Sequence, residues 1–231
     1  MTPRRLFAAL SLGLMSLLAL LTSAAPAASP NWLATVTVTP EGSHILGNSK
    51  APVRLTAWVS YTCSHCAEFE KVSDAPLRLG YVAQGKVAYE IKHILRDPVD
   101  ATVAQLTSCG PKEQFFGNHS MFFRRQAEWI KTLAASSESQ RARWSTGDYA
   151  ARRRAIASDF HFYEIMEQRG YRRTDVDRCL ADNAMAERIA RQTAEAVKIG
   201  FSSTPSFSLG GVPLFGTYTW EQLQPQIRGL L

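Results

Sequence analysis

The sequence predicts an α/β protein: a mixed central sheet with flanking helices, interrupted by an all-helical insertion. Three observations predict it. Strand-like runs lie between residues 34 and 61 and at 86–95, helical periodicity follows from residue 97 for roughly a hundred residues, and short strand patterns return at 206–215. The strand at 53–61, the helix after it and the strand at 86–95 have the spacing of a right-handed βαβ unit with parallel strands.

The length of 231 residues is enough for one large domain or for a domain with an insertion. We divide the chain into a signal peptide at 1–28, a first half of the α/β fold at 29–97, an inserted helical subdomain at 98–195 and a second half of the fold at 196–231. The composition is that of ordinary globular proteins, without a repeat or a low-complexity tract, which excludes fibrous and disordered classes.

A targeting segment precedes the first strand. Arg4 and Arg5 form a short basic region, residues 6–21 are apolar, and the small residues that follow offer cleavage after Ala25 or Ala28. The apolar run is slightly shorter than the roughly 20 residues of a membrane span, which favours cleavage over an uncleaved anchor. Removal of the two arginines lowers the net charge from +6 to +4, which indicates no partner class. We therefore expect export to the periplasm, an oxidising compartment in which disulfides persist.

The strands of the first half come in order. Residues 34–39 alternate threonine with valine, as in a half-buried strand, and residues 44–46 can pair back after a turn. Trp58 lies opposite the apolar face of the strand at 53–61, which indicates a central strand covered on both sides. The helix that follows is interrupted at Pro76.

Cys63 and Cys66 stand at the junction between the strand at 53–61 and this helix, the arrangement of a redox dithiol. Cys63, at the first turn, is expected to face unpaired backbone N–H groups and the positive end of the helix dipole. These favour the thiolate, which is the species that attacks disulfides. Cys66, one turn later, can close the ring or resolve a mixed disulfide. His65, when protonated, places a positive charge near Cys63 and so lowers the pKa of that thiol further. Cys63, Cys66 and His65 are therefore the predicted catalytic residues.

A zinc site and a merely structural disulfide are the two alternatives for this cysteine pair. Structural zinc takes four ligands, usually from a second closely spaced pair, and the sequence has none. The other histidines, His44, His93, His119 and His161, occur singly. We therefore predict redox chemistry, with no metal and no cofactor.

The insertion is rich in aromatic residues, which we interpret as the core of a helical subdomain rather than a ligand site. Residues 136–147 are interpreted as a polar loop between helices, and Thr174, which two acids follow, as the N-cap of a helix. A group of arginines around Trp144 is typical of a solvated face, so we expect no nucleic-acid binding. These are Arg141, Arg143, Arg152, Arg153 and Arg154.

Cys109 and Cys179 both lie in helical segments of the insertion. Two cysteines left over in an oxidising compartment usually pair, so we predict a structural Cys109–Cys179 disulfide that stabilises the protein by about 2–4 kcal/mol. Two buried free thiols are one alternative. A catalytic relay between the two cysteine pairs is another.

The last part of the chain returns to strands. Residues 184–199 form a helix that ends at Gly200, and residues 206–215 form a hairpin around Gly210-Gly211. Thr219 and Gln222 have the spacing of a capping box, which predicts a final helix.

A βαβ unit, a helical insertion and a ββα unit, with CxxC at the start of the first helix, resemble the thioredoxin fold in its DsbA-family form, the exported thiol:disulfide oxidoreductases. The residues that carry the resemblance are Cys63-Ser64-His65-Cys66, Glu68-Phe69-Glu70 and Phe201-Ser202-Ser203-Thr204-Pro205-Ser206-Phe207. The resemblance implies a cis Thr204-Pro205 peptide bond that faces the cysteines. It also implies that the Thr204 backbone pairs, strand-like, with an extended substrate peptide that crosses Cys63, so Thr204 and Pro205 are the predicted substrate-binding residues.

The chain departs from the family pattern in three places. Ser64 stands where the best-known oxidases have proline, and Thr204 is more familiar from the isomerase and reductase relatives. Ala57 occupies a position that is often a buried acid, which helps move the proton of the resolving thiol; Glu70 or water must replace it, or that step is slower.

These observations predict an exported thiol:disulfide oxidoreductase that oxidises dithiols of secreted proteins through Cys63 and Cys66. Its expected partners are reduced or unfolded exported proteins and a redox partner that recycles the pair. Membrane contact is limited to the signal segment or the redox partner. The segment between the leader and residue 53 is too short for the dimerisation domain that isomerase and reductase relatives carry, which argues against those two activities. A monomer is expected. The alternatives are a disulfide isomerase or reductase of the same fold, and a metal carrier that uses Cys63, Cys66 and a histidine.

Overall fold

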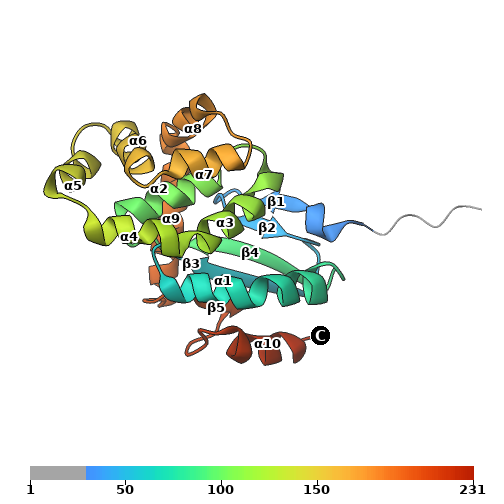
Figure 1. The fold of residues 1–231 in the computed structure, drawn as a ribbon. Helices are drawn as coiled ribbons and strands as arrows, with labels where there is room; N and C mark the ends of the chain where they lie inside the picture. The colour runs from blue at the N-terminus through green and yellow to red at the C-terminus, as the bar shows by residue number, and fades with distance from the viewer. Residues whose placement is uncertain (1–29) are drawn as a thin grey trace, which may run out of the picture. The chain divides into compact units, whose positions relative to one another are not determined.

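The computed structural model describes residues 30–231. The signal peptide predicted at 1–28 lies outside the described residues. Six strands form one mixed sheet in the order β1-β2-β4-β3-β5-β6 (Figure 1). The strands are β1 (Val36–Val38), β2 (His44–Leu46), β3 (Val53–Val59), β4 (Val87–His93), β5 (Ser206–Leu209) and β6 (Val212–Pro213).

The central strand is β3. It pairs in parallel with β4, with Val53 opposite Val87 and Val59 opposite His93, and it pairs antiparallel with β5. The predicted parallel pair is therefore confirmed, and so is the predicted α/β fold class. Six of the seven residues of β3 are buried, as expected of a strand covered on both faces.

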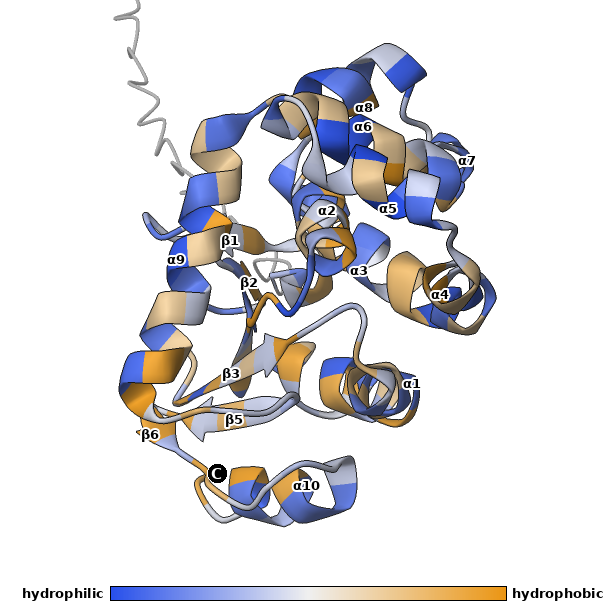
Figure 2. Ribbon diagram, turned by 90° about the vertical axis from the view of Figure 1, so that its left-hand side faces the viewer, coloured by the Kyte–Doolittle hydropathy of each residue, from blue (hydrophilic) through white to orange (hydrophobic). Residues whose placement is uncertain are grey.

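Helices occupy both faces of the sheet. In Figure 2, α9 (Asn183–Ile199) passes on one side of the strands and α1 (Ser64–Leu77) on the other. On the α1 side, the ring centroids of Phe69 and Phe207 lie 4.7 Å apart. On the α9 side, Trp58 is 3% exposed and its ring lies 4.9 Å from that of Phe201. The two covered faces predicted from Trp58 are thus both present.

Helix α1 begins directly after the cysteine junction, with Cys63 as its N-cap. The helix runs through Pro76 and changes only at Arg78, where a π-helical turn, η2 (Arg78–Val82), takes over. Contrary to the prediction, the helix is therefore not interrupted at Pro76, but changes its type two residues later, at Arg78. The predicted continuation of the helical segment to Val82 is confirmed.

The remaining α-helices follow β4 or the last strand, and Figure 1 shows α2 to α8 gathered above the sheet. They are α2 (Pro98–Thr107), α3 (Phe115–Arg124), α4 (Gln126–Ala135), α5 (Glu138–Ser145), α6 (Tyr149–Asp159), α7 (Phe162–Gln168), α8 (Arg173–Leu180), α9 and, at the end, α10 (Trp220–Arg228), with short 3-10 turns η1 (Trp32–Ala34) and η3 (Lys112–Gln114). Among the described residues, no strand interrupts α2 to α9.

Two predictions within this helical part are wrong. Residues 136–147 are not a loop, because α5 occupies most of them; Ser137 and Gln140 form a capping box and Trp144 buries its ring. Thr174 is not an N-cap, because α8 begins at Arg173 after Arg172. The domain boundary predicted after residue 195 falls inside α9, and the division into domains stays a prediction.

Within residues 30–231, no helix is both long and apolar enough to cross a bilayer.

Candidate active site

The two cysteines of the CxxC motif lie side by side at the first turn of α1. Both are free thiols and both are buried, with 4% of Cys63 and 1% of Cys66 exposed. Cys63 has extended backbone angles as the N-cap, so its sulfur is placed at the start of the helix, where the backbone N–H groups lack partners within the helix. The Cys63 sulfur lies 3.2 Å from the Thr204 carbonyl oxygen, to which it can donate when it is protonated.

The two sulfurs differ strongly in acidity. The pKa of Cys63 is lowered to about 4, chiefly by a hydrogen bond from the Cys66 thiol, which outweighs the effect of burial; the Thr204 side chain and the backbone N–H groups of Cys66 and His65 contribute further. Burial raises the pKa of Cys66, and donation to Cys63 raises it again. At neutral pH the site therefore holds a thiolate at Cys63 and a thiol at Cys66.

His65 lies at the first turn of α1 and is exposed. Its backbone N–H is one of the groups that lower the Cys63 pKa. The residue also lines the groove described below. The catalytic role assigned to the imidazolium stays a prediction.

The Thr204-Pro205 peptide bond is cis, as the resemblance implied. Pro205 is buried and Thr204 half-buried directly before β5, the strand that pairs with β3. The fold thus brings the segment around residue 204 against the cysteines from far along the sequence. The substrate-binding role of these two residues stays a prediction.

An apolar groove of about 500 Å³ begins at this meeting point. Phe69 and Val72 of α1, Pro205, and Tyr218 and Trp220 near the start of α10 are among the residues that line it. The capping box at residues 219–222 places Tyr218 and Trp220 at the start of a helix, but their part in this groove depends on how that helix packs against α1.

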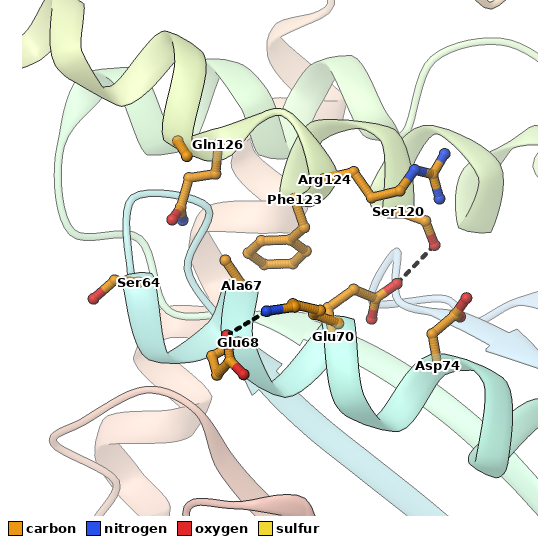
Figure 3. A pocket seen from close by; sticks show the side chains of 11 residues that line it. Ser64, Ala67, Glu68, Glu70, Asp74, Ser120, Phe123, Arg124 and Gln126 are labelled. Atoms are coloured by element: carbon orange, nitrogen blue, oxygen red, sulfur yellow. Dashed lines mark hydrogen bonds and ion pairs between the residues drawn. The ribbon is translucent and has the colours of Figure 1, made fainter.

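A second recess of about 420 Å³ lies between α1 on one side and α3 with the start of α4 on the other (Figure 3). Glu68, Lys71, Asp74 and Arg124 give it a charged lining. Glu68 lines both cavities, so the two meet beside the first turn of α1. Gln126 also lines the recess, and its side chain points from α4 toward the loop before α1.

Glu70 faces this second recess but is a poor substitute for the acid missing at Ala57. Ser120 donates to its carboxylate over 2.7 Å, as Figure 3 shows, and the Nε2 atom of His119 lies 3.3 Å away. Burial would raise its pKa, but His119, Ser120 and Arg78 outweigh burial and hold the pKa at about 2. A carboxylate this acidic takes up a proton poorly at neutral pH.

Asp100, in the first turn of α2, is a buried acid that the sequence analysis missed. It accepts hydrogen bonds from the Ser60 hydroxyl at 2.6 Å and the Tyr61 amide at 2.7 Å, in the loop that leads to Cys63. Burial raises its pKa to about 7, against the effect of these donors. The available signal was the Asp97-Pro98 helix start, which places a first-turn acid at Asp100 but does not say what that acid contacts.

Cys109 and Cys179 form a disulfide in the structure, with their Cα atoms 5.8 Å apart. Cys109 follows the end of α2 and Cys179 lies in α8. Its structural role stays a prediction.

Three of the histidines that look scattered in the sequence lie near one another. The His44 ring stacks on Phe115 at 3.8 Å, and His93 and His119 lie within 6.4 Å of the same ring. Burial lowers the pKa of His44 to about 3 and that of His93 to about 4. In the part of the chain that the structure describes, no three acidic, histidine or cysteine side chains are placed to hold a metal ion.

Comparison with known proteins agrees with this geometry. The family described as Thioredoxin matches residues 39–228. A protein-disulfide isomerase from Novosphingobium aromaticivorans is 48% identical, with a TM-score of 0.77 over 81% of this chain and 96% of that one. The alpha-DsbA1 of Wolbachia pipientis shares the fold at 18% identity, with a TM-score of 0.66 over 84% of this chain and 92% of that one.

Curated sequences give a similar result. A Rickettsia prowazekii protein provisionally named protein-disulfide oxidoreductase is 26% identical over 170 residues, which are 73% of this chain and 54% of that protein. The chain thus spans about half the length of the curated relatives it matches.

Proposed function

Because this chain belongs to the Thioredoxin family, in its DsbA-like form, we propose that it is an exported thiol:disulfide oxidoreductase that introduces disulfides into reduced proteins of the periplasm. The observation that carries the proposal is the split acidity of the two sulfurs: the Cys63 pKa is lowered to about 4 while that of Cys66 is raised. The stabilised thiolate favours the reduced form of the pair, and an enzyme whose reduced form is favoured passes its disulfide on to substrates.

The reaction begins with the Cys63–Cys66 disulfide. A substrate thiolate attacks the Cys63 sulfur, the bond between the cysteines breaks, and Cys66 leaves and takes a proton, which its raised pKa favours. A second substrate thiolate then attacks the substrate sulfur of the mixed disulfide and expels Cys63 as a stable thiolate. The substrate has lost two electrons and the enzyme has gained them, so a redox partner must reoxidise the pair.

The groove beside Cys63 supports unfolded proteins as substrates. Phe69, Val72 and Trp220 offer an apolar lining that suits an apolar side chain near the reacting cysteine of an extended peptide. The Thr204 backbone lies next to the Cys63 sulfur, where it can pair with that peptide. Large apolar side chains are mostly buried once a protein has folded, so an unfolded protein offers more of them to this groove.

Disulfide isomerisation is the second candidate, because the Novosphingobium relative is named a protein-disulfide isomerase and Thr204 precedes the cis proline. Metal carriage is the third, and metal content after purification without chelator tests it. A carrier is expected to retain close to one metal ion per chain.

The experiment compares three activities of the mature protein: oxidative refolding of a reduced multi-cysteine protein, refolding of a scrambled one, and reduction of insulin. We expect oxidation to be fastest. The Cys66→Ser variant is expected to accumulate client proteins in disulfide linkage to Cys63 in the periplasm, and Cys63→Ser is the matched control that traps none. Faster rescue of the scrambled protein would assign isomerisation, and no trapped clients with Cys66→Ser would contradict both.

A further inference from the structure

The loop between β3 and α1 is held by side chains of the helical insertion. Gln126, the first residue of α4, donates from Nε2 to the Tyr61 carbonyl at 2.7 Å and to the Cys63 carbonyl at 2.9 Å. Asp100 accepts from the Tyr61 amide, and Asp97 accepts from the Thr62 hydroxyl over 2.7 Å. The three residues before α1 are thus fixed from α2 on one side and from α4 on the other.

Gln126 and the Tyr61 carbonyl that accepts its hydrogen bond both belong to buried residues. Gln126 is 5% exposed and Tyr61 is fully buried. Within residues 30–231, Gln126 supplies the one hydrogen bond to the Tyr61 carbonyl, whereas the Cys63 carbonyl also accepts from the Ala67 amide. Without the Gln126 amide a buried carbonyl is left without a donor, and the loop is expected to shift to find one.

We propose that Gln126 is a positioning residue of the redox site, which holds the Cys63 sulfur in register with the first-turn N–H groups of α1. Its two hydrogen bonds set the backbone on both sides of Thr62, so they set the direction in which the Cys63 side chain leaves the chain. They also tie the start of α1 to the insertion, so the insertion supports the nucleophile as well as covering the sheet. This inference rests on the proposed function only in taking Cys63 as the nucleophile.

The positioning role of Gln126 can be tested with Gln126→Met, a variant that keeps the size of the side chain but has no hydrogen-bond donors. The measurement is the titration of Cys63 thiolate absorbance in the reduced protein. Because the sulfur loses its alignment with the His65 and Cys66 N–H groups, we expect the acid dissociation constant of Cys63 to fall by about tenfold or more. The rate at which Cys63 attacks a small disulfide is expected to depend on pH with the same midpoint as the thiolate absorbance.

The chain offers a matched control in Gln105. Its Nε2 atom also donates to two backbone carbonyls, Cys179 at 2.7 Å and Asp182 at 2.8 Å, and it is 1% exposed, but both partners lie in the insertion. Gln105→Met is expected to lower the denaturant midpoint of unfolding as Gln126→Met does, and to leave the thiolate titration unchanged. The groups that share the site with Cys63, namely Cys66, His65 and Glu68 on α1 and Asp97 and Asp100 on α2, are intact in both variants.

A milder variant guards against loss of folding. Gln126→Asn keeps an amide that is one methylene too short to span both carbonyls, and we expect an intermediate shift of the titration. An unchanged thiolate midpoint in Gln126→Asn and Gln126→Met, or an equal shift in Gln105→Met, would overturn the proposal. Neither outcome bears on the direction of catalysis, since the titration reports the thiol in the absence of any client.

Discussion

Cys63 and Cys66 are chemically the same residue one helical turn apart, and their surroundings move their pKa values in opposite directions. The spacing and the helix start allowed the pair to be predicted from the sequence, because backbone N–H groups at an N-terminus favour a thiolate wherever they occur. The largest contribution, the Cys66 thiol itself, and that of Thr204 depend on side-chain positions that only the folded chain defines. The role given to the His65 ring went beyond what spacing can establish.

Asp100 leads to a prediction about pH at the same scale. Its pKa is raised to about 7, so the folded protein retains a proton that the unfolded chain has released above about pH 4. Folding stability is therefore expected to fall as the pH rises toward 7, and between pH 5 and 8 this one group accounts for at most about 3 kcal/mol. In Asp100→Asn that contribution is absent. The measurement is the free energy of unfolding in denaturant at several pH values.

The parent and Asp100→Asn must be compared by how steeply the free energy of unfolding changes with pH, not by its absolute value. An asparagine has one acceptor oxygen where the carboxylate has two, so Asp100→Asn is expected to lose hydrogen bonds from Ser60 or Tyr61 at every pH. Only the difference between the two pH profiles reports the proton. Parallel profiles would show that Asp100 is already ionised at pH 5.

At the scale of single elements, strands and capped helices were easier to predict than polar helices. The capping box at Thr219 and the helix end at Gly200 have local causes and are present as predicted. Helix α5 was missed because most of its residues are polar. Its stability comes from the Ser137 capping box and from Trp144, whose ring N–H donates to Asp159 of α6, a contact that no local pattern contains.

Two glycines give a paired prediction about elements. Gly211, in the turn between β5 and β6, has φ +85, whereas Gly80, in the π-helical turn η2, does not have a positive φ. At neither position would an added methyl group come within 4 Å of another atom. Gly211→Ala is expected to destabilise the protein by about 1–2 kcal/mol because an L-residue is strained at positive φ. Gly80→Ala is expected to stabilise it by about 0.5–1 kcal/mol through helix propensity.

Both variants add the same methyl group to an exposed position, so packing cannot account for a difference between them. Thermal unfolding of the two alongside the parent measures the effect. Equal shifts in the same direction would contradict the backbone explanation.

At the scale of the whole molecule, the order of elements was predictable, but the contacts between the insertion and the redox loop were not. The sequence places Asp100 and Gln126 in two different helices, and nothing in their spacing from Tyr61 indicates that both reach its backbone. The same limit applies to His44, His93 and His119, which appear isolated in the sequence and lie around Phe115 in the fold. Such contacts depend on how complete elements pack.

The Cys109–Cys179 bond allows a prediction at this scale. It links positions 70 residues apart, and in the chain-entropy account its loss is expected to lower the free energy of unfolding by about 2–4 kcal/mol. The measurement uses a background in which Cys63 and Cys66 are both alanine, so that only the second pair responds to a reductant. Reduction should destabilise this protein and leave the variant with Cys109→Ala and Cys179→Ala unchanged.

The same design separates the effect of breaking the bond from the effect of losing the packing around the sulfurs. The variant with Cys109→Ala and Cys179→Ala has already lost that packing before the reductant is added. If the reductant changes neither protein, Cys109 and Cys179 are not bonded in solution. Peptide mapping without reductant, with both cysteines recovered alkylated and separate, would give the same answer.

Helix α2 stands between the two cysteine pairs. Its first turn contacts the loop before Cys63, Cys109 follows its last turn, and its ten residues make it about 15 Å long. Thiol exchange between the two sulfur pairs would have to span this helix within one folded chain, so we expect no relay between them. Each molecule is expected to donate one disulfide per cycle, and stoichiometric oxidation of a small dithiol by the isolated protein should stop at one equivalent.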